Sequence, residues 1–573
     1  MSHEFVLIAA AGLAISIVAS VFSRRTGVAA PLLLVALGIG TSFIPATPHL
    51  ELEPELILAG VLPPLLYASA VQLPVIDLRR NLSLITWLSV VMVIVSAVVV
   101  GLLVHLVFPA IPLALGIALG AVVSPTDAVA ATAVGRRVGL PPRLVTVLEG
   151  ESLVNDASAL VVLRSAIVAV GVTGAFSLGE TSVDFVWAVV GAGLAGWFVA
   201  WVTVLVRERL DDPVLNTTIS FVTPFLAYVP AEEMHASGVL AVVVAGLVTG
   251  AMGAKRFSAR DRQTQTTTWA TINFILENGV FLALGYQLPM LIDDAKAETS
   301  TGEVVGMVAL VLAALVALRF AGLAWPALVG RYGPSDRSER VRERLDQIEQ
   351  RVDTWEPKDD REETRLRWAR RRIARASADI AFEEREPITA RGYVVLAWAG
   401  MRGVVTLAAA QTIPSGTPHR DTVVLVACLV AMVSLALFGL TLPALIRRMD
   451  FPSADPAERR DDLLTLMRQI AEDATDTLGP LDEQRVDGEP LDPAVVESLK
   501  ERFLPMLLAG VHRAAESKPG QREQAFIVQR RYLDAMREAL LKERSIGAFS
   551  TETFKQVEGF LDREEQRFSG QPG

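Results

Sequence analysis

The chain has only one cysteine, Cys428, so neither a disulfide framework nor a cysteine-built metal site can form within it. It also lacks an excess of positive charge. The formal net charge is -10 at pH 7, which argues against nucleic acid as a partner. No G-x-x-x-x-G-K-[ST] segment occurs, so the phosphate-binding loop of many nucleotide-hydrolysing proteins is missing. We therefore expect no bound cofactor and no ATP-driven activity.

Long apolar runs dominate the sequence instead. Of the 573 residues 51% are hydrophobic, and the mean hydropathy is +0.41, a value typical of membrane proteins. A helix needs about 17–25 apolar residues to cross a bilayer. The sequence predicts an all-α polytopic membrane protein with about 13 transmembrane helices, at 5–22, 27–45, 55–73, 84–108, 111–134, 144–170, 182–206, 213–230, 237–253, 268–290, 303–329, 391–413 and 421–447.

Basic residues in the short loops predict how the chain is oriented. Arg24 and Arg25 follow the first apolar run, which indicates a retained first helix rather than a signal peptide. Every odd-numbered span ends in basic residues, so we expect a cell-membrane (inner-membrane) protein with its N-terminus outside and its C-terminus in the cytoplasm. The expected parts are transmembrane helices 1–11 over 1–331, a charged cytoplasmic helical loop over 332–389, transmembrane helices 12–13 over 390–449, and a cytoplasmic C-terminal helical domain over 450–573.

The sixth predicted span, which contains ESLVND, carries a polar stripe that lipid cannot solvate. Ser152, Asn155 and Asp156 recur at i, i+3 and i+4, and Glu151 lies one turn before Asn155. A charged side chain at the bilayer centre costs roughly 2.5–3.5 kcal/mol, so this stripe must face protein or a water-filled cavity. A simple hydrogen-bond cluster between helices usually relies on one Ser, Thr or Asn. Two carboxylates beside an amide favour an ion pathway.

The fifth predicted span contains SPTDAVA, in which Pro125 lacks an N–H group and is expected to break the helix. The freed carbonyl groups and the Thr126 hydroxyl are oxygen ligands suited to a small cation. Asp127 is placed to neutralise the positive end of a half-helix. The alternative is an ordinary proline kink with a hydrogen-bonded aspartate.

The twelfth predicted span places Arg402 between Gly400 and Gly403. Arginine keeps its charge when buried, so it requires an acidic partner, and Glu151 is the candidate. The alternative is an arginine that reaches the membrane surface. If spans one to six and eight to thirteen are two inverted repeats, this glycine-flanked span corresponds to the proline-broken fifth, a pairing typical of transporter binding sites.

These segments resemble the first family of monovalent cation:proton antiporters, which includes bacterial sodium/proton antiporters and the sodium/hydrogen exchangers. The matching stretches run in order through the membrane part, and the Asn-Asp pair is the most specific element. One departure is that Tyr67, Ala68, Ser69 and Ala70 stand where many relatives have an acidic residue in the third span. The stretches are LPPLLYASA (62–70), SPTDAVA (124–130), EGESLVNDASALV (149–161), HASGVLAVVVAGL (235–247), ENGVFLALG (277–285) and WAGMRGVVTLA (398–408).

The resemblance implies a role for each matching residue. Asp156 would hold proton and cation in turn, with Asn155, Ser152 and Thr126 completing the cation site. It further implies crossed discontinuous helices, with Asp127 and Pro125 at the crossing, and a structural ion pair between Glu151 and Arg402. Exchange of Na+ (or Li+ or K+) for H+, electroneutral and 1:1, and a homodimer joined through the first spans are also implied.

Burial alone gives Asp156 a means of coupling two ions. A bare buried carboxylate is costly, so either a proton or a cation neutralises it, and only one of them at a time. Three alternatives stay open: a K+/H+ antiporter of the same family, a passive cation channel, and an intramembrane hydrolase that would use Asp127 and Asp156 as an aspartate pair. The apolar and proline-containing context of the two aspartates fits ion transport better than hydrolysis, and the single buried carboxylate favours a carrier over a channel.

Overall fold

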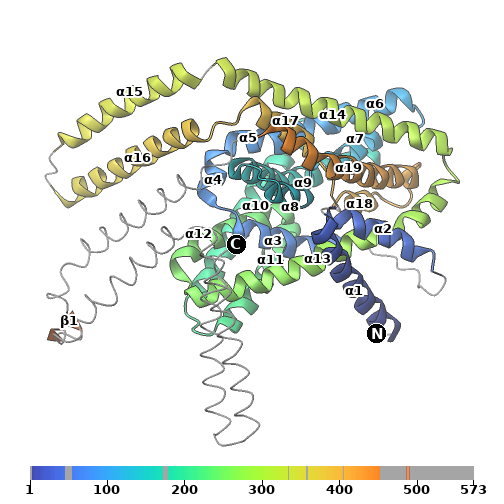
Figure 1. The fold of residues 1–573 in the computed structure, drawn as a ribbon, viewed down its shortest axis with the longest axis horizontal. Coiled ribbons are helices and arrows are strands. Elements are labelled where there is room, and N and C mark those ends of the chain that lie inside the picture. The colour runs from blue at the N-terminus through green and yellow to red at the C-terminus, as the bar shows by residue number, and fades with distance from the viewer. Residues whose placement is uncertain are drawn as a thin grey trace, which may run out of the picture. The chain divides into compact units, whose positions relative to one another are not determined.

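The structure is a computed structural model that describes residues 3–26, 28–44, 55–171, 178–332, 334–355, 359–403 and 405–451, together with 485–486 and 489–490. The first of two structural units ends at Phe451 and is built from helices, as predicted (Figure 1). The predicted C-terminal domain, 450–573, lies almost wholly outside the described residues. Within it the structure describes one antiparallel pair, β1 (Arg485–Val486) with β2 (Glu489–Pro490).

Among the described residues, seven helices are long and apolar enough to span a membrane, and four shorter apolar helices accompany them. The all-helical membrane fold is therefore confirmed, while the count of thirteen spans stays a prediction. The helices in chain order are α1 (His3–Thr26), α2 (Ala30–Ser42), the π-helical η1 (Leu56–Val61), α3 (Leu62–Gln72), α4 (Val75–Arg80), α5 (Leu82–Thr86), the π-helical η2 (Trp87–Val91), α6 (Met92–Val107), α7 (Leu113–Val123), α8 (Ala128–Arg137), α9 (Pro142–Gly171), α10 (Leu178–Arg207), α11 (Pro213–Glu233), α12 (Gly238–Arg256), α13 (Ala259–Ala295), α14 (Thr301–Tyr332), α15 (Pro334–Asp353), α16 (Asp360–Arg385), α17 (Ala390–Trp398), α18 (Val405–Gln411) and α19 (Arg420–Met449).

Two of the predicted spans are each divided into two helices. The span predicted at 111–134 is α7 followed by α8, with Pro125 in the non-helical segment between them. The span predicted at 391–413 is α17 followed by α18, and Gly400, Arg402 and Gly403 lie in the break. Both interruptions leave backbone groups without helical partners, which is tolerated at membrane depth only where protein or water can satisfy them.

The helix α9 lies between two clusters of buried apolar side chains. Leu148 and Leu163 belong to the larger cluster, which includes residues of α6, α7, α14 and α19. Leu153 and Ala157 belong to the second cluster, with residues of α3, α10, α11 and α12. The polar stripe of α9 is therefore held where two groups of helices meet.

Small residues allow the closest helix contacts. A Cβ atom added to Gly38 of α2 would lie 2.2 Å from the carbonyl oxygen of Leu282, and one added to Gly285 of α13 would lie 2.1 Å from that of Val35. Close approach of this kind is typical of membrane helices, which gain little from the hydrophobic effect when they associate. It brings α13 tightly against α2 and fixes one wall of the site described below.

The segment predicted as a charged loop, 332–389, contains α15 and α16, which lie side by side (Figure 1). Val352 of α15 packs with Leu366 and Ile373 of α16 in a small apolar cluster. The charged residues that fill most other positions of these helices remain available for contacts at the surface.

Candidate functional site

The two non-helical segments touch each other. The backbone N–H of Asp127 donates a hydrogen bond to the carbonyl oxygen of Met401, at 2.7 Å. A Cβ atom added to Gly403 would lie 2.6 Å from both the Cβ and an Oδ2 oxygen of Asp127. The absence of a side chain at Gly403 thus permits the contact between the broken helices.

Asp127 stands directly before Ala128, the first residue of α8. A carboxylate at this place lies beside the positive end of the helix dipole, where negative charge is favourable. Ser152 reinforces the same helix end, since its Oγ accepts a hydrogen bond from the backbone N–H of Ala128 at 3.3 Å. The α9 stripe therefore caps α8 through a hydroxyl group.

Asn155 and Thr126 connect the stripe to the break. The Asn155 Nδ2 group donates to the carbonyl oxygen of Thr126 at 3.2 Å and to its Oγ1 at 3.0 Å, and Thr126 Oγ1 donates to Glu151 Oε1 at 2.8 Å. Asn155 is 1% exposed, and its Oδ1 is buried without a hydrogen-bond partner among the described residues. Asn155 thus fixes the broken segment with its nitrogen and leaves its oxygen uncommitted.

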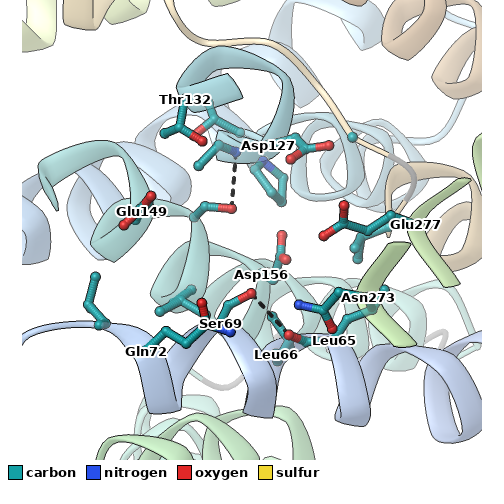
Figure 2. A pocket seen from close by; sticks show the side chains of 18 of the residues that line it. Leu65, Leu66, Ser69, Gln72, Asp127, Thr132, Glu149, Asp156, Asn273 and Glu277 are labelled. Carbon is teal, nitrogen blue, oxygen red and sulfur yellow. Dashed lines mark hydrogen bonds between the residues drawn. The ribbon is translucent and has the colours of Figure 1, made fainter. Parts of the chain in front are cut away.

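Asp156 differs from its neighbours on the stripe. It is only 7% exposed, and no described residue donates a hydrogen bond to its carboxylate or forms an ion pair with it. The carboxylate faces a cavity of about 680 Å³ (Figure 2). A buried carboxylate without partners is costly in its charged form, so this position favours binding of a proton or a cation.

The predicted ion pair between Glu151 and Arg402 is wrong, because Glu151 has another partner. Arg319 of α14 donates to both carboxylate oxygens of Glu151, from Nη1 at 2.6 Å and from Nη2 at 3.0 Å. Its Nε donates to the carbonyl oxygen of Leu396 at 3.1 Å. The two side chains are 11% and 1% exposed, so this is a buried bidentate pair.

Arg402 instead donates hydrogen bonds to backbone carbonyl groups that the helix breaks leave without helical partners. Its Nε donates to the carbonyl oxygen of Val123 at 2.8 Å, and its Nη1 donates to that of Gly400. Val123 is the last residue of α7, so its carbonyl group has no helical partner. The arginine therefore joins the ends of both broken helices, which is a structural task other than the one predicted for it.

The cavity brings together side chains from several helices, including residues that sequence analysis did not single out. Figure 2 shows Glu277 and Asn273 of α13 on the wall opposite Asp156, with Asp127 nearby. Glu149 lines another part of the wall. Glu277 and Arg319 each interrupt an apolar span of the sequence. Because a charge in a membrane is costly to bury, both residues could have been recognised from the sequence as functional or structural candidates.

Part of the lining comes from the ends of helices, the short helix α4 and the connections beside them. We call five of these residues the rim: Gln72, Pro74, Asp77, Leu140 and Pro142. The third predicted span adds Leu65, Leu66 and Ser69 to the wall, and α3 has no carboxylate. The cavity thus extends from Asp156 to the ends of α3, α4 and α9. It offers carboxylate, hydroxyl and amide oxygens, which suit a hydrated or partly dehydrated cation.

Similarity to proteins of known sequence agrees with this geometry. The family described as "Sodium/hydrogen exchanger, transmembrane" matches residues 12–448. The chain is 31% identical over 438 residues to the "Sodium, potassium, lithium and rubidium/H(+) antiporter" of Bacillus pumilus, which covers 73% of this chain and 58% of that protein. It is 27% identical over 564 residues to "Uncharacterized Na(+)/H(+) exchanger Rv2287" of Mycobacterium tuberculosis, covering 96% and 93% of the two chains.

An antiporter of the same name from Bacillus subtilis is matched over 44% of its own length. The chain thus spans about half the length of these two Bacillus relatives. Among solved structures, the sodium proton antiporter MjNhaP1 of Methanocaldococcus jannaschii has a TM-score of 0.56 at 15% identity, over 78% of this chain and 99% of that chain. This likeness supports the fold. With the family match extending over most of the sequence, the chain belongs to the sodium/hydrogen exchanger family.

Proposed function

We propose that the protein is a secondary antiporter that exchanges a monovalent cation, Na+ in the first instance, for H+ across the cell membrane. The observation that carries the proposal is the Asp156 carboxylate, which is buried, lacks a partner among the described residues and faces the cavity. The printed names of the relatives describe Na+, K+, Li+ and Rb+ exchange for H+, which supports the same class of substrates.

Competition at one carboxylate accounts for the coupling. Neutralising Asp156 with a proton or with a cation removes most of the cost of its burial, but the two cannot occupy it together. The carboxylate without either ion would have to cross the membrane as a bare charge, which is unfavourable. Each time the site changes the side of the membrane to which it opens, Asp156 therefore carries one of the two ions. Movement of cations in one direction and of protons in the other follows.

The neighbouring groups have distinct parts in this proposal. Ser152 and Thr126 supply hydroxyl oxygens, and the uncommitted Oδ1 of Asn155 supplies an amide oxygen beside Asp156. Since Asn155 is neutral, Asp156 would be the only charge of the Asn-Asp pair. One proton would then replace one monovalent cation, and the exchange would be electroneutral.

Contacts of the loop arginines support the predicted orientation. Arg79 and Arg80 follow the third predicted span, and both bind Asp379 of the segment predicted to be cytoplasmic, at 2.8 and 2.9 Å. Two separate parts assigned to the cytoplasm thus lie on one face. The rim residues adjoin the same contacts, so the cavity would open to the cytoplasm.

The proposed assembly is a homodimer joined through the first spans, as expected from the family resemblance. Many apolar side chains of α1 are exposed, among them Ile17, Val18 and Phe22. Such a face contacts lipid or a second subunit. Cross-linking of cysteines placed on α1 in native membranes would support the dimer if it yields a two-chain product, and oppose it if only single chains are found.

The proposal is tested with purified protein in vesicles that contain a pH-sensitive dye. Addition of Na+, Li+ or K+ should change the internal pH with the parent protein, and Asp156→Asn should abolish the change. Asp293→Asn makes the same chemical change at an exposed carboxylate, with a side chain 72% exposed, and should leave exchange intact. Cation conductance without proton movement would favour the channel alternative, and the order of ions would decide between Na+ and K+.

A further inference from the structure

The C-terminal end of α16 lies against the helices that carry the rim. Asp379 accepts a hydrogen bond from Arg79 Nη2 at 2.8 Å and one from Arg80 Nε at 2.9 Å. One carboxylate of the charged segment therefore binds two arginines of α4. Arg80 Nη1 also lies 3.7 Å from an oxygen of Asp77, which is a rim residue.

An aromatic ring extends the same contact to a third arginine. The Cζ atom of Arg80 lies 4.4 Å from the ring centroid of Phe382, and the Cζ atom of Arg143 lies 5.4 Å from it. Both distances are in the range of cation–π attraction. Arg143 Nε also donates to Asn81 Oδ1 at 2.9 Å, and its Nη1 donates to the carbonyl oxygen of Glu386.

These three arginines come very near the cation route. Arg79 and Arg80 follow the rim residue Asp77 by two and three positions, and Arg143 directly follows the rim residue Pro142. None of the three lines the cavity. Three guanidinium groups free to swing over the rim would repel an approaching cation, and their contacts with α16 restrain them.

We propose that Asp379 and Phe382 are positioning residues for cation entry: they hold Arg79, Arg80 and Arg143 against α16, which keeps the rim attractive to cations. This inference rests on the proposed antiport function. The segment 332–389 thereby takes part in transport although it lies outside the ion-binding site. The carboxylates of Glu383 and Glu386 also lie near Arg143 and add to the negative surroundings that restrain it.

The expected effect is on cation capture and not on the exchange step. A unit charge about 10 Å from a cation in a watery opening changes the local cation concentration roughly twofold. Release of two arginines from Asp379 would then raise the KM for Na+ about two- to fivefold and leave the maximal rate unchanged. Asp379 and Arg79 are partly exposed, with side chains 37% and 49% exposed, so their pair contributes little to folding stability.

The test measures Na+ dependence in inside-out membrane vesicles, which present the cytoplasmic face to the added cation. Asp379→Asn should raise KM, and Asp379→Glu should restore it. Glu384→Gln is the matched control, because it removes a carboxylate from the same end of α16 whose ion pair, at 3.0 Å, is with Arg342 of α15. A high concentration of choline chloride, which screens charge, should bring the KM of Asp379→Asn close to that of the parent.

A second set of variants shows whether Asp379 acts through the arginines. With Arg79 and Arg80 both replaced by Gln, Asp379→Asn should have no further effect on KM. If Asp379→Asn is not recovered in the membrane, Phe382→Leu provides the same comparison and should also raise KM. An unchanged KM, or a lower maximal rate at unchanged KM, would overturn the inference. A parent protein that shows no Na+-driven proton movement would instead contradict the proposed antiport.

Discussion

Replacement of Arg319 by Met tests which arginine stabilises Glu151. Glu151 is 1% exposed, so the substitution would leave its charge buried without the cation that pairs with it. Breaking a buried ion pair in this way costs about 3–5 kcal/mol. The lower half of that range is expected here, because Thr126 Oγ1 would still donate its hydrogen bond to Glu151 at 2.8 Å.

A double-mutant cycle separates the pair from other effects. Glu151→Gln in the Arg319→Met background removes the stranded charge, and the coupling between the two changes should be about 2–3 kcal/mol. Arg402→Met should cost stability on its own, because two carbonyl groups lose a charged donor, at Val123 and Gly400. Its effect should add to that of Glu151→Gln with little coupling.

Thermal unfolding of the purified protein in detergent is a suitable assay. The midpoint of Arg319→Met should fall by on the order of 5 °C and recover in part with Glu151→Gln. Strong coupling of Glu151 to Arg402, together with none to Arg319, would refute the pairing described above and restore the one expected from sequence.

Two further substitutions act at the helix crossing and at the ion site. Gly403→Ala should lower the exchange rate at least tenfold, because the new methyl group would lie 2.6 Å from Asp127. Gly416→Ala is the control and should leave the rate unchanged, because no atom lies within 4 Å of the added Cβ. Equal rates for both variants would contradict the crossing contact. Asn155→Asp should make exchange sensitive to membrane potential by adding a second carboxylate beside Asp156, and a potential-independent rate would argue against the proposed stoichiometry.

Much of the framework followed from local chemistry. Pro125 cannot donate a helical hydrogen bond, so the break between α7 and α8 was predictable from the residue itself. The spacing of Ser152, Asn155 and Asp156 placed them on one face of α9 without knowledge of any neighbour. Predictions of this kind depend on bond geometry and helical period alone.

The partners across helices were less predictable. Two arginines, Arg319 and Arg402, interrupt apolar spans, and the sequence does not say which of them lies opposite Glu151, because that depends on how α14 and α17 pack around α9. The position of Glu277, which faces Asp156 across the cavity, likewise depends on how α13 packs beside α9. The uncommitted oxygen of Asn155 became apparent only when the contacts of Thr126 were known.

The central claim is that a proton and a cation compete for Asp156, and proton release on Na+ binding tests it most directly. Calorimetric titration of the purified protein with NaCl, in buffers of different ionisation enthalpy, gives the number of protons released per cation bound. About one proton should be released by the parent protein near neutral pH, and Asp156→Asn should release none. Na+ binding without proton release, or equal release by the variant, would contradict the account.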